Sequence, residues 1–81
     1  MASFTGTINT HNTYQKVSDL TGITFISDRT YTIQVQNAAY FKVDNAEFLF
    51  SNKEFQYKAS NYDLYIKTST MPCVLSILEE V

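Results

Sequence analysis

Side chains that could do chemistry are few in this chain, and they stand apart from one another. Histidine occurs once, at His11, and cysteine once, at Cys73. A general base needs a positioned partner, and a nucleophile needs a base or a cation beside it. Neither residue has such a neighbour in the sequence. We therefore interpret His11 as a solvent-exposed side chain and Cys73 as a buried, inert thiol, and we expect no catalytic residue.

The carboxylates do not form a catalytic or metal-binding pattern. Four of the eight fall in turn-forming clusters, where aspartate bonds its own backbone: Asp19, Asp28, Asp44 and Asp63. The D-x-D-x-D-G spacing of a calcium loop is absent, and a single histidine and cysteine are too few for a structural zinc site. Gly6 and Gly22 are isolated, whereas phosphate-binding loops need clustered glycines. We expect neither a metal nor another cofactor.

Aromatic side chains are the remaining candidates for binding. They make up 15% of the chain, all of them Tyr or Phe. Most are expected to pack in the core or at an interface, but aromatics displayed on a sheet can also stack on sugars or bases. Nucleic acid is not expected as a partner, because the net charge is -2 and the six basic residues are dispersed. The candidate binding or interface residues are Tyr40, Tyr62 and Tyr65.

The element that must position these side chains is a sheet. Residues 30–36 alternate between large apolar and uncharged polar side chains. Successive side chains of a strand point to opposite faces, so Tyr31, Ile33 and Val35 should be buried, and Thr32 and Gln34 more exposed. This alternation is typical of an antiparallel sheet with one solvated face.

Further strand candidates recur every 8–12 residues, with turn signals between them. They are residues 14–17, 23–26, 40–43, 47–50, 55–59, 64–68 and 73–79. The predicted turns include residues 18–22, 27–29 and 44–45, and a break falls at 37–39. A helix is an alternative to strand only over residues 38–50. We predict an all-β fold, a compact antiparallel β-sandwich or small barrel of about seven short strands. The single β domain covers 14–81 and follows a polar N-terminal arm, 1–13, which either frays or pairs as a strand.

The size of the chain makes association an expectation. A domain of 81 residues buries a modest core, and one cysteine excludes an intrachain disulfide. Charged residues are only 17%, so little charge protects the strand edges. We expect a homo-oligomer or a complex with a larger partner, with residues 1–13 or 73–79 in the contact. Neither a signal peptide nor a transmembrane segment is visible, so no membrane partner is expected.

Two segments carry a family resemblance. Leu20-Thr21-Gly22-Ile23-Thr24-Phe25 followed by residues 31–37, together with Asp63-Leu64-Tyr65-Ile66-Lys67, resembles strands of small all-β accessory structural proteins of tailed bacteriophages and prophages. The resemblance implies a virion structural protein, made in the host cytoplasm, that decorates a capsid or joins a tail or fibre through protein–protein contacts and self-assembly. It implies no catalytic residues. Because the chain stops directly after its last strand, decoration or assembly is favoured over receptor binding.

The residues alone leave another class of function open. A small glycan- or ligand-binding β module could use exposed tyrosine and asparagine side chains on the sheet. An enzyme is the least favoured class, because no constellation of catalytic side chains is visible.

Overall fold

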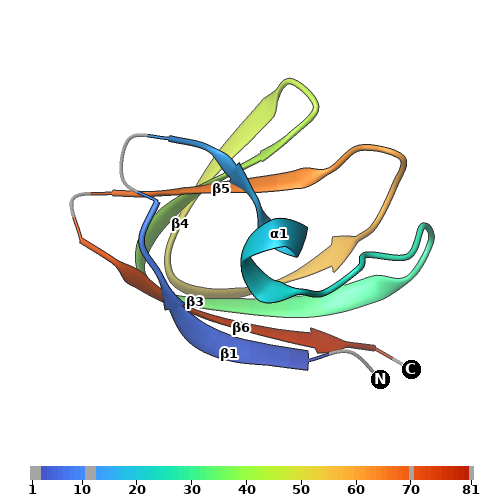
Figure 1. Ribbon diagram of the computed structural model, residues 1–81, viewed down its shortest axis with the longest axis horizontal. Helices are drawn as coiled ribbons and strands as arrows, with labels where there is room; N and C mark the ends of the chain where they lie inside the picture. Colours follow the sequence, from blue (N-terminus) through green and yellow to red (C-terminus); the bar gives the residue numbers. More distant parts are fainter. Residues whose placement is uncertain (1–2, 11–12, 70, 81) are drawn as a thin grey trace.

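The computed structural model describes residues 3–10, 13–69 and 71–80, which contain six strands and one short helix (Figure 1). All strand pairings are antiparallel, and the sheet curls into a half-barrel, which confirms the predicted antiparallel all-β class. The elements are β1 (Ser3–Ile8), β2 (Gln15–Lys16), α1 (Val17–Thr21), β3 (Thr30–Val43), β4 (Ala46–Lys58), β5 (Leu64–Thr68) and β6 (Cys73–Glu79).

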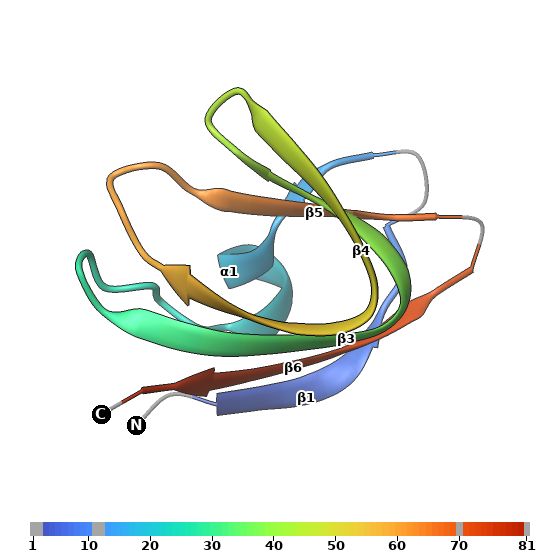
Figure 2. The same ribbon diagram turned by 180° about the vertical axis from the view of Figure 1, so that it is seen from behind.

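The long strand β3 organises the sheet. The strand order is β1-β6-β3-β5-β2, and β4 pairs with the opposite flank of β3. The first half of β3 pairs with β6 and its second half with β5, whereas β4 follows β3 along nearly its whole length. Figure 2 shows the β3–β4 hairpin bending around the molecule as it passes from one half of the sheet to the other.

A β-bulge stands where the sequence predicted a break at 37–39. The register between β3 and β4 shifts between Val35 and Ala38. Asn37 and Asn52 adopt positive φ angles of 69° and 50°, a region that asparagine tolerates better than most residues. The Asn37 N–H donates to Asn52 Oδ1 at 2.9 Å. The bulge bends the hairpin without ending it, so four of the predicted strands form two long ones, and strand replaces the competing helix over 38–50.

The core lies inside the curl, on the face that the alternation of residues 30–36 predicted. Tyr31, Ile33 and Val35 are fully buried, whereas Gln34 is exposed and Thr32 only partly covered. Every second residue of β6 joins the same core through Cys73, Leu75 and Ile77. The predicted register is therefore confirmed.

The segment between β2 and β3 differs from the prediction. The strand expected over 14–17 is reduced to β2, and the turn expected over 18–22 is the five-residue helix α1. Gly22 ends this helix with φ 76°, and its N–H donates to the Ser18 carbonyl oxygen at 2.9 Å. Residues 23–26 form no strand: Ile23 enters the core, and the Ile26 N–H donates to Tyr31 Oη at 2.8 Å. Ile23 and partly buried Phe25 thus cover the core from a loop and do not extend the sheet, whereas Ile26 is 46% exposed.

The described residues of the N-terminal segment belong to the sheet. β1 pairs with β6 from Ser3 opposite Leu78 to Ile8 opposite Cys73. Beyond β1, buried Thr10 donates from its N–H to Thr68 Oγ1 at 3.1 Å, and its own Oγ1 accepts from the Thr68 N–H at 3.2 Å. His11 lies outside the described residues. Within them, no helix has the length and apolar character needed to cross a membrane.

Candidate functional site

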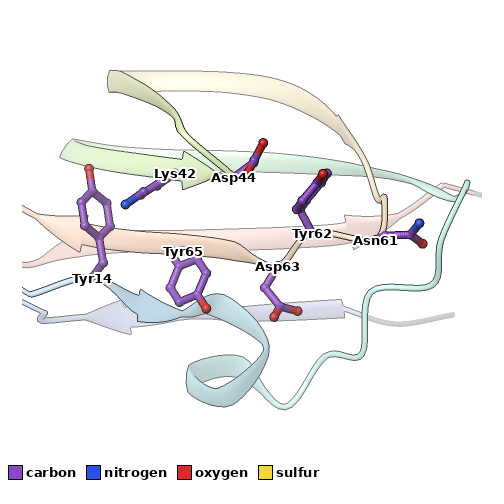
Figure 3. Close-up of a pocket in the computed structure, with 7 residues that line it drawn as sticks. All are labelled: Tyr14, Lys42, Asp44, Asn61, Tyr62, Asp63 and Tyr65. Carbon is purple, nitrogen blue, oxygen red and sulfur yellow. The ribbon is translucent and has the colours of Figure 1, made fainter.

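Two hollows lie on opposite faces of the curled sheet. The first is a polar pocket of about 400 Å³ on the outer face, here called the tyrosine pocket. Its lining residues come from β3, β5, the turn between β3 and β4, and the segments before β2 and β5 (Figure 3): Tyr14, Lys42, Asp44, Asn61, Tyr62, Asp63 and Tyr65.

Strand register brings the lining of the tyrosine pocket together. Lys42 of β3 lies directly opposite Tyr65 of β5, so both side chains share the outer face. Asp44 occupies the turn after β3 with φ 54°, which places its side chain at the rim. On the other rim, the Tyr62 N–H donates to Ser60 Oγ at 3.3 Å, and Tyr57 Oη donates to the Tyr62 carbonyl oxygen at 3.4 Å.

Two lysines lie near the ring of Tyr14. Lys67 Nζ lies 4.7 Å from the centroid of its ring, and Lys42 Nζ lies 5.6 Å away, both within cation–π range. The Tyr14 hydroxyl is shielded from solvent and has no hydrogen-bond partner of good geometry among the described residues. Burial first, and then the nearby Glu47 carboxylate, raise the pKa of Tyr14. The Tyr14 ring thus forms one wall of the pocket, with two ammonium groups beside it.

An exposed ion pair borders the pocket. Lys16 Nζ lies 3.4 Å from Asp63 Oδ2, and both side chains are about half exposed. The hydrogen bond to Asp63 raises the pKa of Lys16. Because solvent screens such pairs, this one positions Asp63 more than it stabilises the fold.

The three tyrosines singled out from the sequence occupy different places. Tyr62 and Tyr65 line the pocket, and 56% of Tyr62 is exposed. Tyr40 lies outside the lining but shares Lys67 with Tyr14, at 5.1 Å from Nζ to the ring centroid. Sequence reasoning missed Tyr14, which only the pairing of β2 with β5 brings close.

The lining of the tyrosine pocket contains three phenol rings, two carboxylates, an amide and an ammonium group. These groups suit a polar, hydroxyl-rich ligand better than an apolar one.

The second hollow is the phenylalanine groove, about 300 Å³ on the inner face of β3 and β4. Phe50 and Phe55 stack at 4.3 Å between ring centroids, and Phe41 meets Phe55 edge-on at 5.2 Å. Phe48 stacks on Phe50 at 6.3 Å and is 48% exposed. The groove residues are Phe41, Val43, Phe48, Phe50, Phe55, Gln56, Tyr57, Lys58 and Leu64.

The groove lies beside an open sheet edge. Among the described strands, β4 pairs with β3 alone, so its other flank offers unpaired backbone groups along 13 residues. On the outer face of the same strand, Leu49 is 56% exposed. Apolar side chains thus flank a free edge on both faces, an arrangement typical of interaction sites.

Among the described residues, the remaining candidate for reactivity is Cys73. Cys73 is fully buried, as predicted, and burial raises the pKa of its thiol, which disfavours the nucleophilic thiolate. The described part of the chain contains no group of three His, Cys, Asp or Glu residues that could hold a metal ion.

Comparison with known proteins found no match to this chain among family models, curated proteins or solved structures.

Proposed function

We propose that this protein is a small structural subunit that acts through protein–protein contacts. The observation that carries the proposal is strand β4, where the phenylalanine groove adjoins a free edge 13 residues long. Native proteins cover such edges with charge, proline or another chain. Across the part of β4 from Phe48 to Asn52, no charged side chain or proline blocks pairing. A partner strand would satisfy the backbone groups and bury the exposed rings.

The more specific proposal is a virion structural protein of a tailed phage or prophage, in capsid decoration or in a tail or fibre. Its support is the resemblance carried by residues 20–37 and 63–67. The test is to purify phage particles from the strain that encodes the chain and to quantify the protein by mass spectrometry. We expect a fixed copy number per particle that survives density-gradient purification. Particles that lack the protein would overturn the virion role.

The tyrosine pocket supports a second candidate, the binding of a glycan. Exposed Tyr62 offers a ring face, while Asn61 and Asp63 offer hydrogen-bonding groups beside it. The test is calorimetric titration with a panel of neutral oligosaccharides. Binding that Tyr62→Ala abolishes and Tyr40→Ala preserves would support this function, because Tyr40 lies outside the pocket lining. Absence of heat across the panel at millimolar sugar would count against it.

A further inference from the structure

We propose that β4 pairs antiparallel with β4 of a second copy of this chain, around a two-fold axis between Asn52 and Lys53. The proposal rests on the proposed function of protein–protein contact and deepens it by naming the partner and the register. It differs from the expectation drawn from the sequence, which placed the contact at residues 1–13 or 73–79.

The edge strands of the sheet differ in the length of free flank that they offer to a partner. The described sheet has three edge strands, of which β1 has six residues, β2 two and β4 thirteen. β6 is no edge, because β1 covers one flank and β3 the other. β4 therefore offers the longest ladder, and it alone combines a free flank with large apolar side chains exposed on both faces, at Phe48 and Leu49.

The sequence of β4 is complementary to its own reversed sequence. With the axis between Asn52 and Lys53, each charged end of the strand meets the opposite charge, and each aromatic ring meets an aromatic ring. The opposed pairs are Glu47 with Lys58, Phe48 with Tyr57, Leu49 with Gln56, and Phe50 with Phe55. A two-fold axis repeats each pair, so the dimer would contain two Glu47–Lys58 contacts.

Neighbouring registers lose this match. A shift of two residues places Glu47 opposite Gln56 in one direction and opposite Ser60 in the other. The second of these shifts also sets Lys53, opposite buried Val35 on the inner face, against Glu54 of the outer face. One of these shifts also sets Phe50 opposite Lys53. Cross-strand pairs of opposite charge and of aromatic rings stabilise antiparallel sheets. The charges at the two ends of β4, together with the faces of its side chains, thus favour one register.

The bulge keeps the paired side chains on matching faces. Phe48 and Phe50 lie opposite Phe41 and Ala39 of β3, which are buried on the core side. Beyond the bulge, the residues on that same side are Phe55 and Tyr57, opposite buried Ile33 and Tyr31. An axis perpendicular to the sheet leaves inner faces on the same side. The two phenylalanine grooves would therefore join into one, and the partner's ring would cover exposed Phe48.

Charge exchange tests the register directly. Sedimentation of the full chain over a concentration series should show a monomer–dimer equilibrium. Glu47→Lys and Lys58→Glu should each raise the dissociation constant about tenfold or more, because both place like charges opposite each other twice. The double variant should recover the wild-type constant, and an equimolar mixture of the two single variants should form the heterodimer. Asp19→Lys, on helix α1, changes the net charge as Glu47→Lys does and should have no effect.

Disulfide trapping gives a second readout that does not depend on the charged variants folding well. Leu49→Cys and Gln56→Cys place thiols directly opposite each other across the proposed interface. A mixture of these two variants should cross-link under mild oxidation, whereas neither should cross-link alone, because identical positions lie seven residues apart along the ladder. Buried Cys73 should not interfere.

Several results would overturn the β4 pairing. A strictly monomeric wild-type chain up to the highest soluble concentration would do so. A dimer whose dissociation constant is unchanged by the charge reversals, and which gives no cross-link in the mixture of cysteine variants, would also do so, because it uses another surface. These results are distinguishable from a failure of the proposed function. If particles contain the protein but β4 does not pair, the structural role stands and the contact lies on another surface. A β4 dimer absent from particles would remove the virion role alone.

Discussion

Strands β6 and β4 lie on opposite flanks of β3, yet the two flanks differ in what covers them. β6 buries every second side chain and has β1 on its far side, so it lies inside the fold. β4 has no residue that is fully buried, and its far side is free among the described strands. The same central strand thus has one flank that holds the fold together and another that remains open to contact.

The difference follows from the side chains on the inner face. β6 places medium-sized residues against the centre of the core, and the curl of the sheet encloses them. β4 places large rings on the inner face of the half-barrel, where Phe50, Phe55 and Tyr57 are only partly buried against the core and Phe48 is 48% exposed. Aromatic residues there pack on each other and leave one side accessible, as interface rings do.

The largest expected effect separates the centre of the sheet from its open flank. Ile33→Asp should unfold the domain or lower its free energy of unfolding by more than about 3 kcal/mol, because it buries an unpaired charge. The matched Phe48→Asp should lower it by about 1 kcal/mol or less, since that side chain is half exposed. Urea denaturation of both variants measures the contrast, and a thermally stable Ile33→Asp would refute the burial argument.

Truncation of one leucine on each flank gives a matched pair with a smaller effect. Leu75→Ala on β6 should cost about 2–5 kcal/mol of unfolding free energy, because it leaves a cavity at a fully buried position. Leu49→Ala on β4 should change the unfolding free energy of the monomer by about 0.5 kcal/mol or less. Equal losses in denaturant melts at low protein concentration would show that β4 is part of the folding core.

The bulge that joins the two halves of the hairpin should be moderately sensitive. Asn37→Ala forces an alanine into positive φ and removes the side-chain bond from Asn37 Nδ2 to the Pro72 carbonyl oxygen. We expect a loss of about 1–2 kcal/mol. Asn37→Gly, which tolerates the same φ, separates the two causes: it should recover most of the backbone part. Differential scanning calorimetry of both variants measures this, and equal melting temperatures for wild type and Asn37→Ala would contradict the strain argument.

The smallest effect is expected from alkaline titration. Burial raises the pKa of Cys73 and of Tyr57, and burial together with Glu47 raises that of Tyr14. The folded state therefore keeps these protons to higher pH than the unfolded state does. Their contribution to stability is complete below the unfolded pKa values, about 8.5 for Cys and 10 for Tyr, and is lost as pH rises through the folded values.

Denaturant melts between pH 7 and 11 measure this alkaline loss. The slope of unfolding free energy against pH above pH 10 should be shallower in Tyr14→Phe and Tyr57→Phe than in the wild-type chain. An unchanged slope in both variants would show that other groups cause the loss.

The alternation of apolar and polar residues within a segment predicted those strands whose burial does not depend on residues far away in the sequence. Residues 30–36 form a strand with the expected apolar face, and the strand candidates 64–68 and 73–79 form β5 and β6. Whether Asn37 ends a strand or bends it depends on Asn52, fifteen residues away, which local pattern does not show. The same holds for residues 23–26, whose apolar side chains fit a strand but cover the core as a loop.

The tyrosine pocket was only partly visible in the sequence for a similar reason. Tyr62 and Tyr65 stand out because they lie in an aromatic-rich segment. Tyr14 lies about fifty residues earlier in a polar stretch and reaches the pocket only because β2 pairs with β5. Helix α1 was missed because Ser18, Asp19 and Gly22 are common to turns and to the ends of helices.

The pairing of β1 with β6 has a consequence for how the protein folds during its synthesis. β1 receives its partner only when β6 has been made, nearly seventy residues later. The buried contacts between Thr10 and Thr68 depend on the same late arrival. Until then the apolar inner face of β3 lacks one flank and remains exposed to other nascent chains. A delay before β6 is made and pairs would therefore lengthen the interval in which the protein can misassemble.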